Sequence, residues 1–87
     1  SARVSEGGFT ASAVDVRMVL REAIMRQCTA IVFCHNHPSG ALTPSMADRE
    51  LTRRLVAACG AVDITLVDHV IVSTQGYYSF SEEGSLY

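Results

Sequence analysis

The fold is decided by one stretch of the chain, TAIVFCHNHPSGALTPSMAD, which occupies residues 29–48. Residues 29–34 are apolar and partly β-branched, a composition typical of a fully buried strand. We expect this strand to end at His35. The Pro, Ser and Gly residues that follow predict a loop over residues 38–44.

A helix is predicted to follow this loop. Thr43 is a good N-cap residue, and Pro44 suits the first position of a helix. The apolar spacing continues to about Cys59, and Gly60 is predicted to end the helix. The same periodicity places Asp48 on the core-facing side of the first turn.

The rest of the chain completes an α/β pattern. Asp15 is predicted to cap a helix whose apolar residues recur every three or four positions. This helix is predicted over residues 15–28. Apolar, β-branched runs and turn residues predict the other elements: a short strand and glycine turn in 2–10, one or two strands in 63–73, a turn at 74–76 and a strand at 77–80. The order βαβαββ predicts a mixed β-sheet flanked by helices.

Composition limits the function classes. The 87 residues predict one small domain, with 48% hydrophobic and 18% charged residues, which is typical of globular proteins. No apolar run approaches the ~20 residues of a membrane span, and the start lacks a signal peptide, so we expect a soluble, cytoplasmic protein or a fragment of one. The net charge of -2 argues against a general polyanion-binding module. The three cysteines lack CxxC spacing and predict no disulfide.

The candidate site joins the end of the strand to the start of the helix. His35 and His37 would share one face if the strand continues to them. Asp48 would then supply a third ligand from the helix. Two imidazoles and one carboxylate form a set that binds catalytic Zn²⁺, with one position open for water. The metal lowers the pKa of its water to about 7. The competing interpretation is a polar turn that contains two histidines by chance.

Three other residues each have two interpretations. Ser45 is either a first-turn residue of the helix or a hydrogen-bond donor to an oxyanion. Asp68 and His69 either satisfy each other and the backbone inside the core, or orient a ligand histidine from behind.

At this point the residues resemble a known pattern. His35-x-His37-Pro38, six residues, Ser45, two residues and Asp48 is similar to the JAMM motif of MPN+ metalloproteases. The words HNHPSG, TPSMAD and LVDHVIV resemble the RadC family more closely, and the resemblance covers essentially all 87 residues. It implies a JAB/MPN-type fold with a layout similar to cytidine deaminases. It also implies that His35, His37 and Asp48 hold zinc and that Ser45 assists the tetrahedral intermediate.

The family pattern also includes an upstream glutamate that acts as general base. We expect residues 1–87 to lack the N-terminal element that carries it, and Glu6 is the only nearby acid in the N-terminal stretch. The other interpretation of Glu6 is a solvated residue at the end of a strand.

Three hypotheses follow from different classes. The leading one is a zinc-dependent hydrolase that uses a metal-activated water on a peptide or protein amide or isopeptide bond. The second is a nucleic-acid-binding module associated with DNA repair, a label that RadC-like proteins carry. The third is a metal-binding domain without catalysis.

Overall fold

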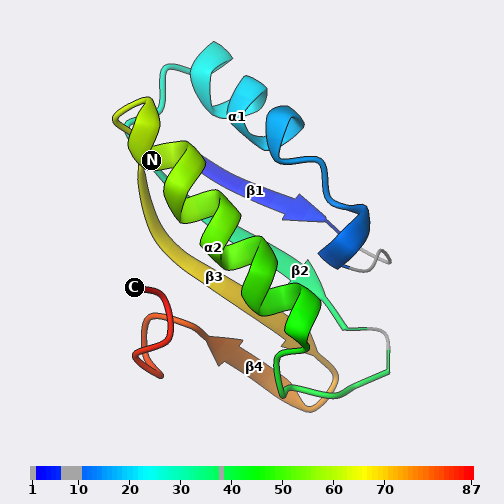
Figure 1. Ribbon diagram of the computed structural model, residues 1–87. Coiled ribbons are helices and arrows are strands. Elements are labelled where there is room, and N and C mark those ends of the chain that lie inside the picture. Colours follow the sequence, from blue (N-terminus) through cyan, green and yellow to red (C-terminus); the bar gives the residue numbers. More distant parts are fainter. Residues whose placement is uncertain (1, 7–10, 38) are drawn as a thin grey trace.

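The computed structural model describes the backbone of residues 2–6 and also residues 11–37 and 39–87. The glycine turn predicted within residues 7–10 and the first residue of the 38–44 loop lie outside this description. The elements are β1 (Ala2–Glu6), the 3₁₀-helix η1 (Ala11–Ala13), α1 (Val16–Met25), β2 (Ala30–Asn36), α2 (Met46–Ala61), β3 (Thr65–Ser73) and β4 (Gly76–Ser79). The predicted βαβαββ order is therefore confirmed (Figure 1).

The sheet is mixed, as predicted. Its strands lie in the order β1-β2-β3-β4, with the first three parallel and β4 antiparallel to β3. Parallel neighbours need crossover connections, which α1 and α2 provide. Because such crossovers are right-handed and the strands advance in one direction, both helices lie on the same face of the sheet (Figure 1). The carboxyl ends of the parallel strands consequently meet at one edge, where α2 begins.

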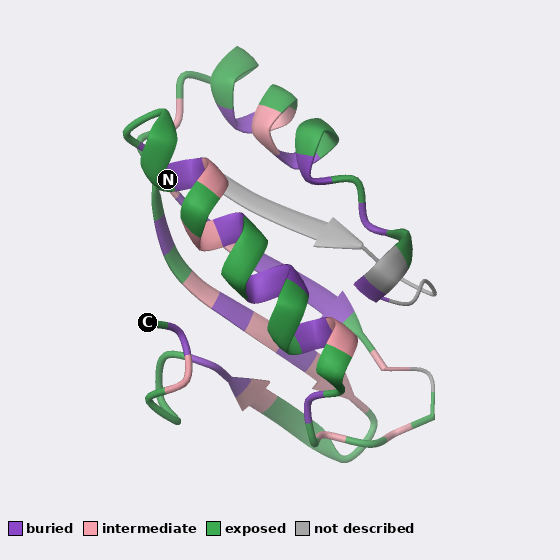
Figure 2. Cartoon of the chain, in the orientation of Figure 1, coloured by how far each residue is buried: buried purple, intermediate pink, exposed green. Residues whose placement is uncertain are grey.

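The hydrophobic core lies between the two helices and this face of the sheet. Figure 2 shows the buried residues along the inward side of α2 and on the central strands. On β2 the alternate residues Ile31, Phe33 and His35 are all buried, which is the alternation expected of a strand. The apolar core consists of Ala11, Val14, Val16, Val19, Ala23, Ile31, Phe33, Leu51, Leu55, Cys59, Ile64, Leu66, Ile71, Phe80 and Leu86. The polar cluster of the site continues this layer toward the carboxyl edge.

The start of α2 differs from its prediction. Ser45, not Thr43, is the N-cap, and the helix begins at Met46. Ser45 is the cap because its hydroxyl oxygen accepts a hydrogen bond from the Asp48 backbone N–H, and its own backbone N–H donates to the Asp48 carboxylate. This capping box satisfies two otherwise unpaired groups at once. Pro44 therefore precedes the helix and does not occupy its first turn.

The carboxyl ends of both helices also differ from their predictions. α2 continues to Ala61, so Gly60 lies inside the helix, and Asp63 takes the left-handed conformation with φ 59°. α1 keeps the predicted Asp15 cap but ends at Met25, because the chain turns at Gln27 with φ 56°. Apolar spacing continues past both of these backbone turns, so it does not locate a helix end.

The second half of the sheet follows the simpler of its two predicted forms. The 63–73 segment contains one strand, β3, which runs from Thr65 to Ser73 and includes Asp68 and His69. β4 ends at Ser79, and Phe80 leaves the strand to fill the core with 1% of its surface exposed. Among the helices that the structure describes, none has the length and apolar character to cross a membrane.

Candidate metal centre

The two histidines come from the carboxyl end of β2. His35 lies in the strand and only 2% of it is exposed. His37 follows the strand, but its backbone N–H still donates to the Val72 carbonyl at 3.0 Å, as if the ladder with β3 continued. The chain therefore stays extended, and both rings lie on the same side with centroids 5.2 Å apart.

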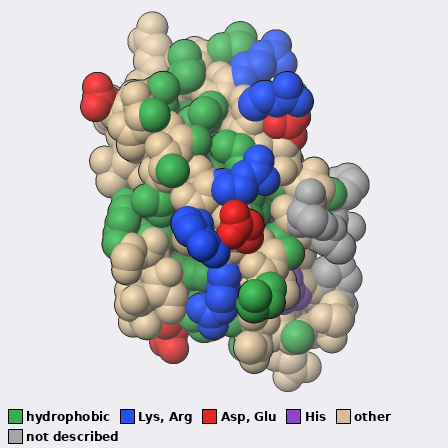
Figure 3. Space-filling model, viewed as in Figure 1, with side chains coloured by type: hydrophobic (Ala, Val, Ile, Leu, Met, Phe, Trp, Pro, Cys, Tyr) green, Lys and Arg blue, Asp and Glu red, His purple; other side chains and the backbone are tan. Residues whose placement is uncertain are grey.

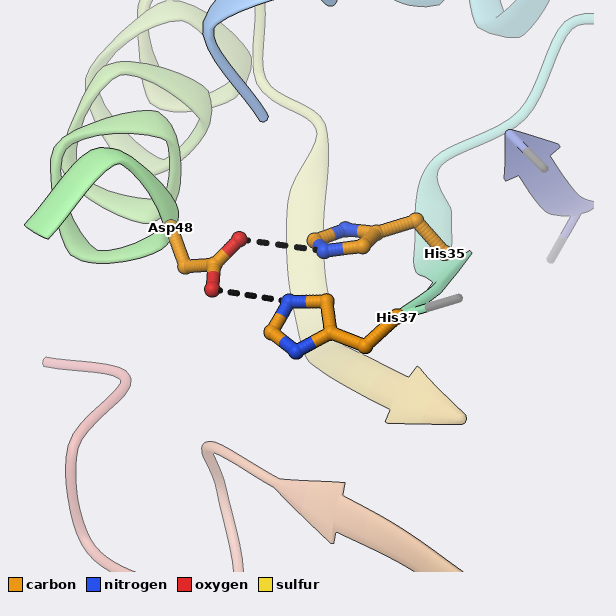
Figure 4. A group of neighbouring side chains, drawn as sticks. All are labelled: His35, His37 and Asp48. Carbon is orange, nitrogen blue, oxygen red and sulfur yellow. Dashed lines mark ion pairs between the residues drawn. The ribbon is translucent and has the colours of Figure 1, made fainter. Parts of the chain in front are cut away.

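Asp48 meets the two rings from the first turn of α2 (Figure 4). Its Oδ1 lies 3.0 Å from Nε2 of His35, and its Oδ2 lies 2.9 Å from Nε2 of His37. The carboxylate is 1% exposed and is held by the Ser45 backbone N–H at 2.7 Å. The helix start thus fixes the position of one candidate ligand, and the strand end fixes the other two.

The loop after β2 sets the proton of His37. Nδ1 of His37 lies 2.9 Å from the Ala41 carbonyl, which can only accept a hydrogen bond. Nδ1 must therefore carry the proton in the neutral ring, and Nε2 presents its lone pair to Asp48. A backbone carbonyl behind a histidine is a common partner of a metal-ligating ring.

Nε2 of His35 has no hydrogen-bond partner among the described residues. It lies 3.0 Å from Oδ1 of Asp48, but the two atoms do not have the geometry of a hydrogen bond. One ligand atom from each of His35, His37 and Asp48 lies within 4.8 Å of the others. Burying these three electron-rich atoms together costs free energy unless a cation lies between them. The three donors fit a divalent metal ion in type, number and spacing.

The electrostatics agree with this fit. Burial acts to raise the pKa of Asp48, but hydrogen bonds from Ser45 and the two nearby histidines outweigh it, so this pKa lies below 3.8. Burial lowers the pKa of His35 more than the Asp48 charge raises it. Burial and His35 together lower the pKa of His69 to about 4. At neutral pH the site therefore offers an ionised Asp48 carboxylate and a neutral His35 imidazole, the forms that bind metal.

Ser45 is exposed at the rim of the cluster. Its oxygen accepts the Asp48 N–H at 3.1 Å, which leaves its own proton free to donate. It serves as the cap of α2, the first of its two interpretations, and its position beside a candidate ligand also suits the second.

Asp68 and His69 are adjacent in sequence but differ in surroundings. The Asp68 carboxylate accepts from the backbone N–H groups of His69 and Ser81 and from the hydroxyl of Ser79, so it anchors the segment after β4. Nε2 of His69 lies 3.0 Å from Nδ1 of His35. Only His69 of this pair therefore contacts a candidate ligand.

Glu6 ends β1, where its backbone is in register with His35. Its side chain lies outside the described residues. Sequence reasoning missed two groups of the site, the Ala41 carbonyl and Thr52. Thr52 lies four residues after Asp48 on the same buried stripe of α2, and this spacing was the available signal.

Known proteins resemble this chain over most of its length. A family model described as RadC-like JAB domain matches residues 1–85. A UPF0758 protein of Symbiobacterium thermophilum is 52% identical over 83 residues, which cover 95% of this chain and 36% of the relative. One from Flavobacterium johnsoniae is 41% identical over the same span, with 36% of the relative covered. The UPF0758 protein YeeS of Escherichia coli is 46% identical over 80 residues, covering 92% of this chain and 54% of the relative. The chain thus spans between a third and about half of the length of these relatives.

Proposed function

The chain belongs to the RadC-like JAB domain family, and we propose that it is a zinc-dependent hydrolase of the metallopeptidase or isopeptidase type. The observation that carries the proposal is the convergence of Nε2 of His35, Nε2 of His37 and the Asp48 carboxylate. A set of two imidazoles and one carboxylate with an open position is typical of catalytic zinc sites. When bound, zinc would activate a water and polarise a carbonyl.

The protein's own residues divide the remaining work. His35 and Asp48 are almost fully buried and would hold the metal from the interior of the protein. The His37 side chain is 17% exposed and marks the side of the site that is open to solvent. A groove of about 280 Å³ is lined by His37 together with Asn36, Val72, Ser73 and Thr74. We infer that a peptide or protein substrate would approach along this groove to His37.

Ser45 would act on the substrate oxygen. Its hydroxyl oxygen is occupied as an acceptor by the helix backbone, so its proton is the part available to a substrate. Donors aimed at a developing oxyanion contribute about 100-fold or more to such reactions. Ser45→Asp would keep the cap but remove the donated proton, and it separates this role from helix capping.

The first experiment measures zinc per chain by mass spectrometry of the metal after dialysis. We expect about one zinc per wild-type chain and almost none for His37→Ala. Asn36→Ala is the matched control, because Asn36 lies between the two histidines but on the opposite face of the strand. Substoichiometric zinc in the wild type, or equal zinc in both variants, would contradict the proposal.

The second experiment measures hydrolysis of fluorogenic peptide and isopeptide substrates by the zinc-loaded chain. The same assay is run on a full-length relative from Thermotoga maritima, of which the matched region is 34%. Hydrolysis that His37→Ala abolishes supports the enzyme. Stoichiometric zinc without hydrolysis in either protein supports the metal-binding domain without catalysis.

One observation favours a second candidate, the nucleic-acid-binding module. Basic side chains gather along α2 (Figure 3), where Arg49, Arg53 and Arg54 are all exposed. Arg53 is already paired with Glu50 at 2.8 Å, and the net charge is -2. Salt-dependent DNA binding that is lost when the three arginines are replaced by glutamine would support this candidate. No binding at low salt would remove it.

A further inference from the structure

A buried chain of polar groups lies behind His35, on the side away from the candidate metal position. Nδ1 of His35 lies 3.0 Å from Nε2 of His69, and Nδ1 of His69 lies 2.6 Å from the hydroxyl oxygen of Thr52. That hydroxyl donates to the backbone carbonyl of Asp48 at 3.0 Å. Both Thr52 and His69 are buried, with 3% and 0% of their surfaces exposed.

The position of His69 is fixed by packing. Its ring is stacked on Phe80, with centroids 4.6 Å apart and planes 9° apart, and it meets the edge of Phe33 at 5.3 Å. Two aromatic contacts on a fully buried ring leave little freedom to turn. The hydrogen bonds of His69 are consequently set by its surroundings.

The direction of these hydrogen bonds follows from one proton. Thr52 has a single hydroxyl proton, and the Asp48 carbonyl can only accept it. The Thr52 oxygen must then accept from Nδ1 of His69. A neutral His69 with its proton on Nδ1 has a lone pair on Nε2, so it accepts from Nδ1–H of His35.

The reverse direction leaves a defect at Thr52. If Thr52 donated to His69, its oxygen would face the Asp48 carbonyl at 3.0 Å with no proton between them. His69 would then donate to His35, whose own proton would move to Nε2. Nε2 would then carry the proton 3.0 Å from the Asp48 carboxylate and would have no lone pair to offer a metal ion. The first direction gives both hydrogen bonds of the Thr52 hydroxyl a proton and leaves the Nε2 lone pair of His35 available to a cation.

We propose that Thr52 and His69 are positioning residues that hold the proton of His35 on Nδ1 and so present the lone pair of Nε2 to the metal. These hydrogen bonds through Thr52 and His69, here called the relay, begin at the backbone carbonyl of Asp48. The relay therefore links the helix that carries one candidate ligand to the strand that carries His35. Its effect on metal affinity rests on the proposed function. The order of its protons does not, because that order belongs to the metal-free chain.

The proton positions can be observed directly. Nuclear magnetic resonance of the metal-free chain with ¹⁵N-labelled histidine distinguishes a protonated ring nitrogen from a bare one at a pH where all three rings are neutral. We expect bare Nε2 and protonated Nδ1 in both His35 and His69. A proton on Nε2 of His35 would overturn the proposal, whether or not the chain binds zinc. If the chain shows the expected proton order but fails to bind zinc in the assay above, the result would count against the proposed function and not against the relay.

Thr52→Val tests the origin of the relay, because valine keeps the shape and removes the hydroxyl. We expect the His35 proton to move to Nε2 and the zinc affinity to fall by about 10–100-fold, the range for outer partners of ligands. Thr52→Ser restores the hydroxyl and is expected to rescue both readouts. Thr43→Val, at an exposed threonine before the helix, is the matched control and is expected to change neither.

Weaker zinc binding by Thr52→Val with the His35 proton still on Nδ1 would overturn the relay, because the hydroxyl would then act only through packing. Failure of Thr52→Ser to restore the proton order would overturn it as well.

Discussion

The two helices begin with the same chemistry in opposite surroundings. At α1, Asp15 caps the helix by accepting the Arg17 backbone N–H at 3.0 Å, and the Arg17 side chain pairs with it in solvent. At α2, Asp48 completes a capping box with Ser45, but its carboxylate is buried and meets two histidines. Both carboxylates have a lowered pKa, the first through hydrogen bonds with Arg17 and the second against its own burial.

The difference teaches what the buried site lacks. Asp15 has a guanidinium partner that supplies positive charge and donors. Asp48 has no guanidinium or ammonium partner among the described residues, and the atoms that face it are two ring nitrogens and the Ser45 backbone N–H. A helix cap becomes a candidate metal centre when the cation that balances its carboxylate does not come from a side chain.

The largest expected effect comes from removing the charge of Asp48, with the same substitution at Asp15 as the comparison. Asp48→Asn is expected to weaken zinc binding by more than about 100-fold, because it removes a ligand and not only an outer partner of one. Its amide oxygen still accepts the Ser45 N–H, so the helix start is kept. Titration calorimetry measures the affinity, and Asp15→Asn should leave it unchanged. Equal losses in both variants would contradict the comparison.

Zinc should stabilise the chain through Asp48 and not through Asp15. Free zinc at 100 times its Kd is expected to raise the free energy of unfolding by about 2.7 kcal/mol. For a domain of this size the Tm would rise by roughly 10–20 °C. Thermal unfolding followed by circular dichroism measures the shift. It should persist in Asp15→Asn and vanish in Asp48→Asn.

Acid should destabilise the metal-free chain through His69, which lies behind His35. Folding lowers the pKa of His69 from 6.5 to about 4, so between these values the unfolded state binds more protons. Stability is therefore complete above this window and falls as the pH drops, by about 2 kcal/mol at pH ~5 from His69 alone. Urea unfolding at several pH values measures this slope. His69→Gln should flatten it, and a slope unchanged in this variant would assign the effect elsewhere.

The smallest effect concerns the cap itself. Ser45→Ala is expected to lower the free energy of unfolding by about 1 kcal/mol, because Asp48 N–H loses its acceptor. Ser45→Asp should recover most of this loss, since aspartate also caps well. Chemical unfolding measures both. Zinc affinity should change little in either variant, because the ligands remain. A large loss of affinity would mean that the hydroxyl orients Asp48.

Local pattern predicted much of this protein. The alternation along β2 and the loop signals that follow were enough to propose His35 and His37 as neighbours. The helical periodicity of α2 was enough to predict that Asp48 lies on the core-facing side of the helix, toward these histidines. The exact helix start was not predictable from composition, because Thr43 and Ser45 are both good caps. The choice depended on which of them could exchange hydrogen bonds with Asp48.

Short-range periodicity thus accounts for the order of elements and for three candidate ligands, because each of these repeats within a few residues. The partner of His35 is different. His69 lies 34 residues away, and it reaches the ring because β3 pairs with β2 in a register that places it beside Phe33. Strand register depends on how the whole sheet packs against α2, and a hydrogen bond is sensitive to tenths of an ångström. Folding in three dimensions therefore selected His69 over the adjacent Asp68, although the two stand side by side in the sequence.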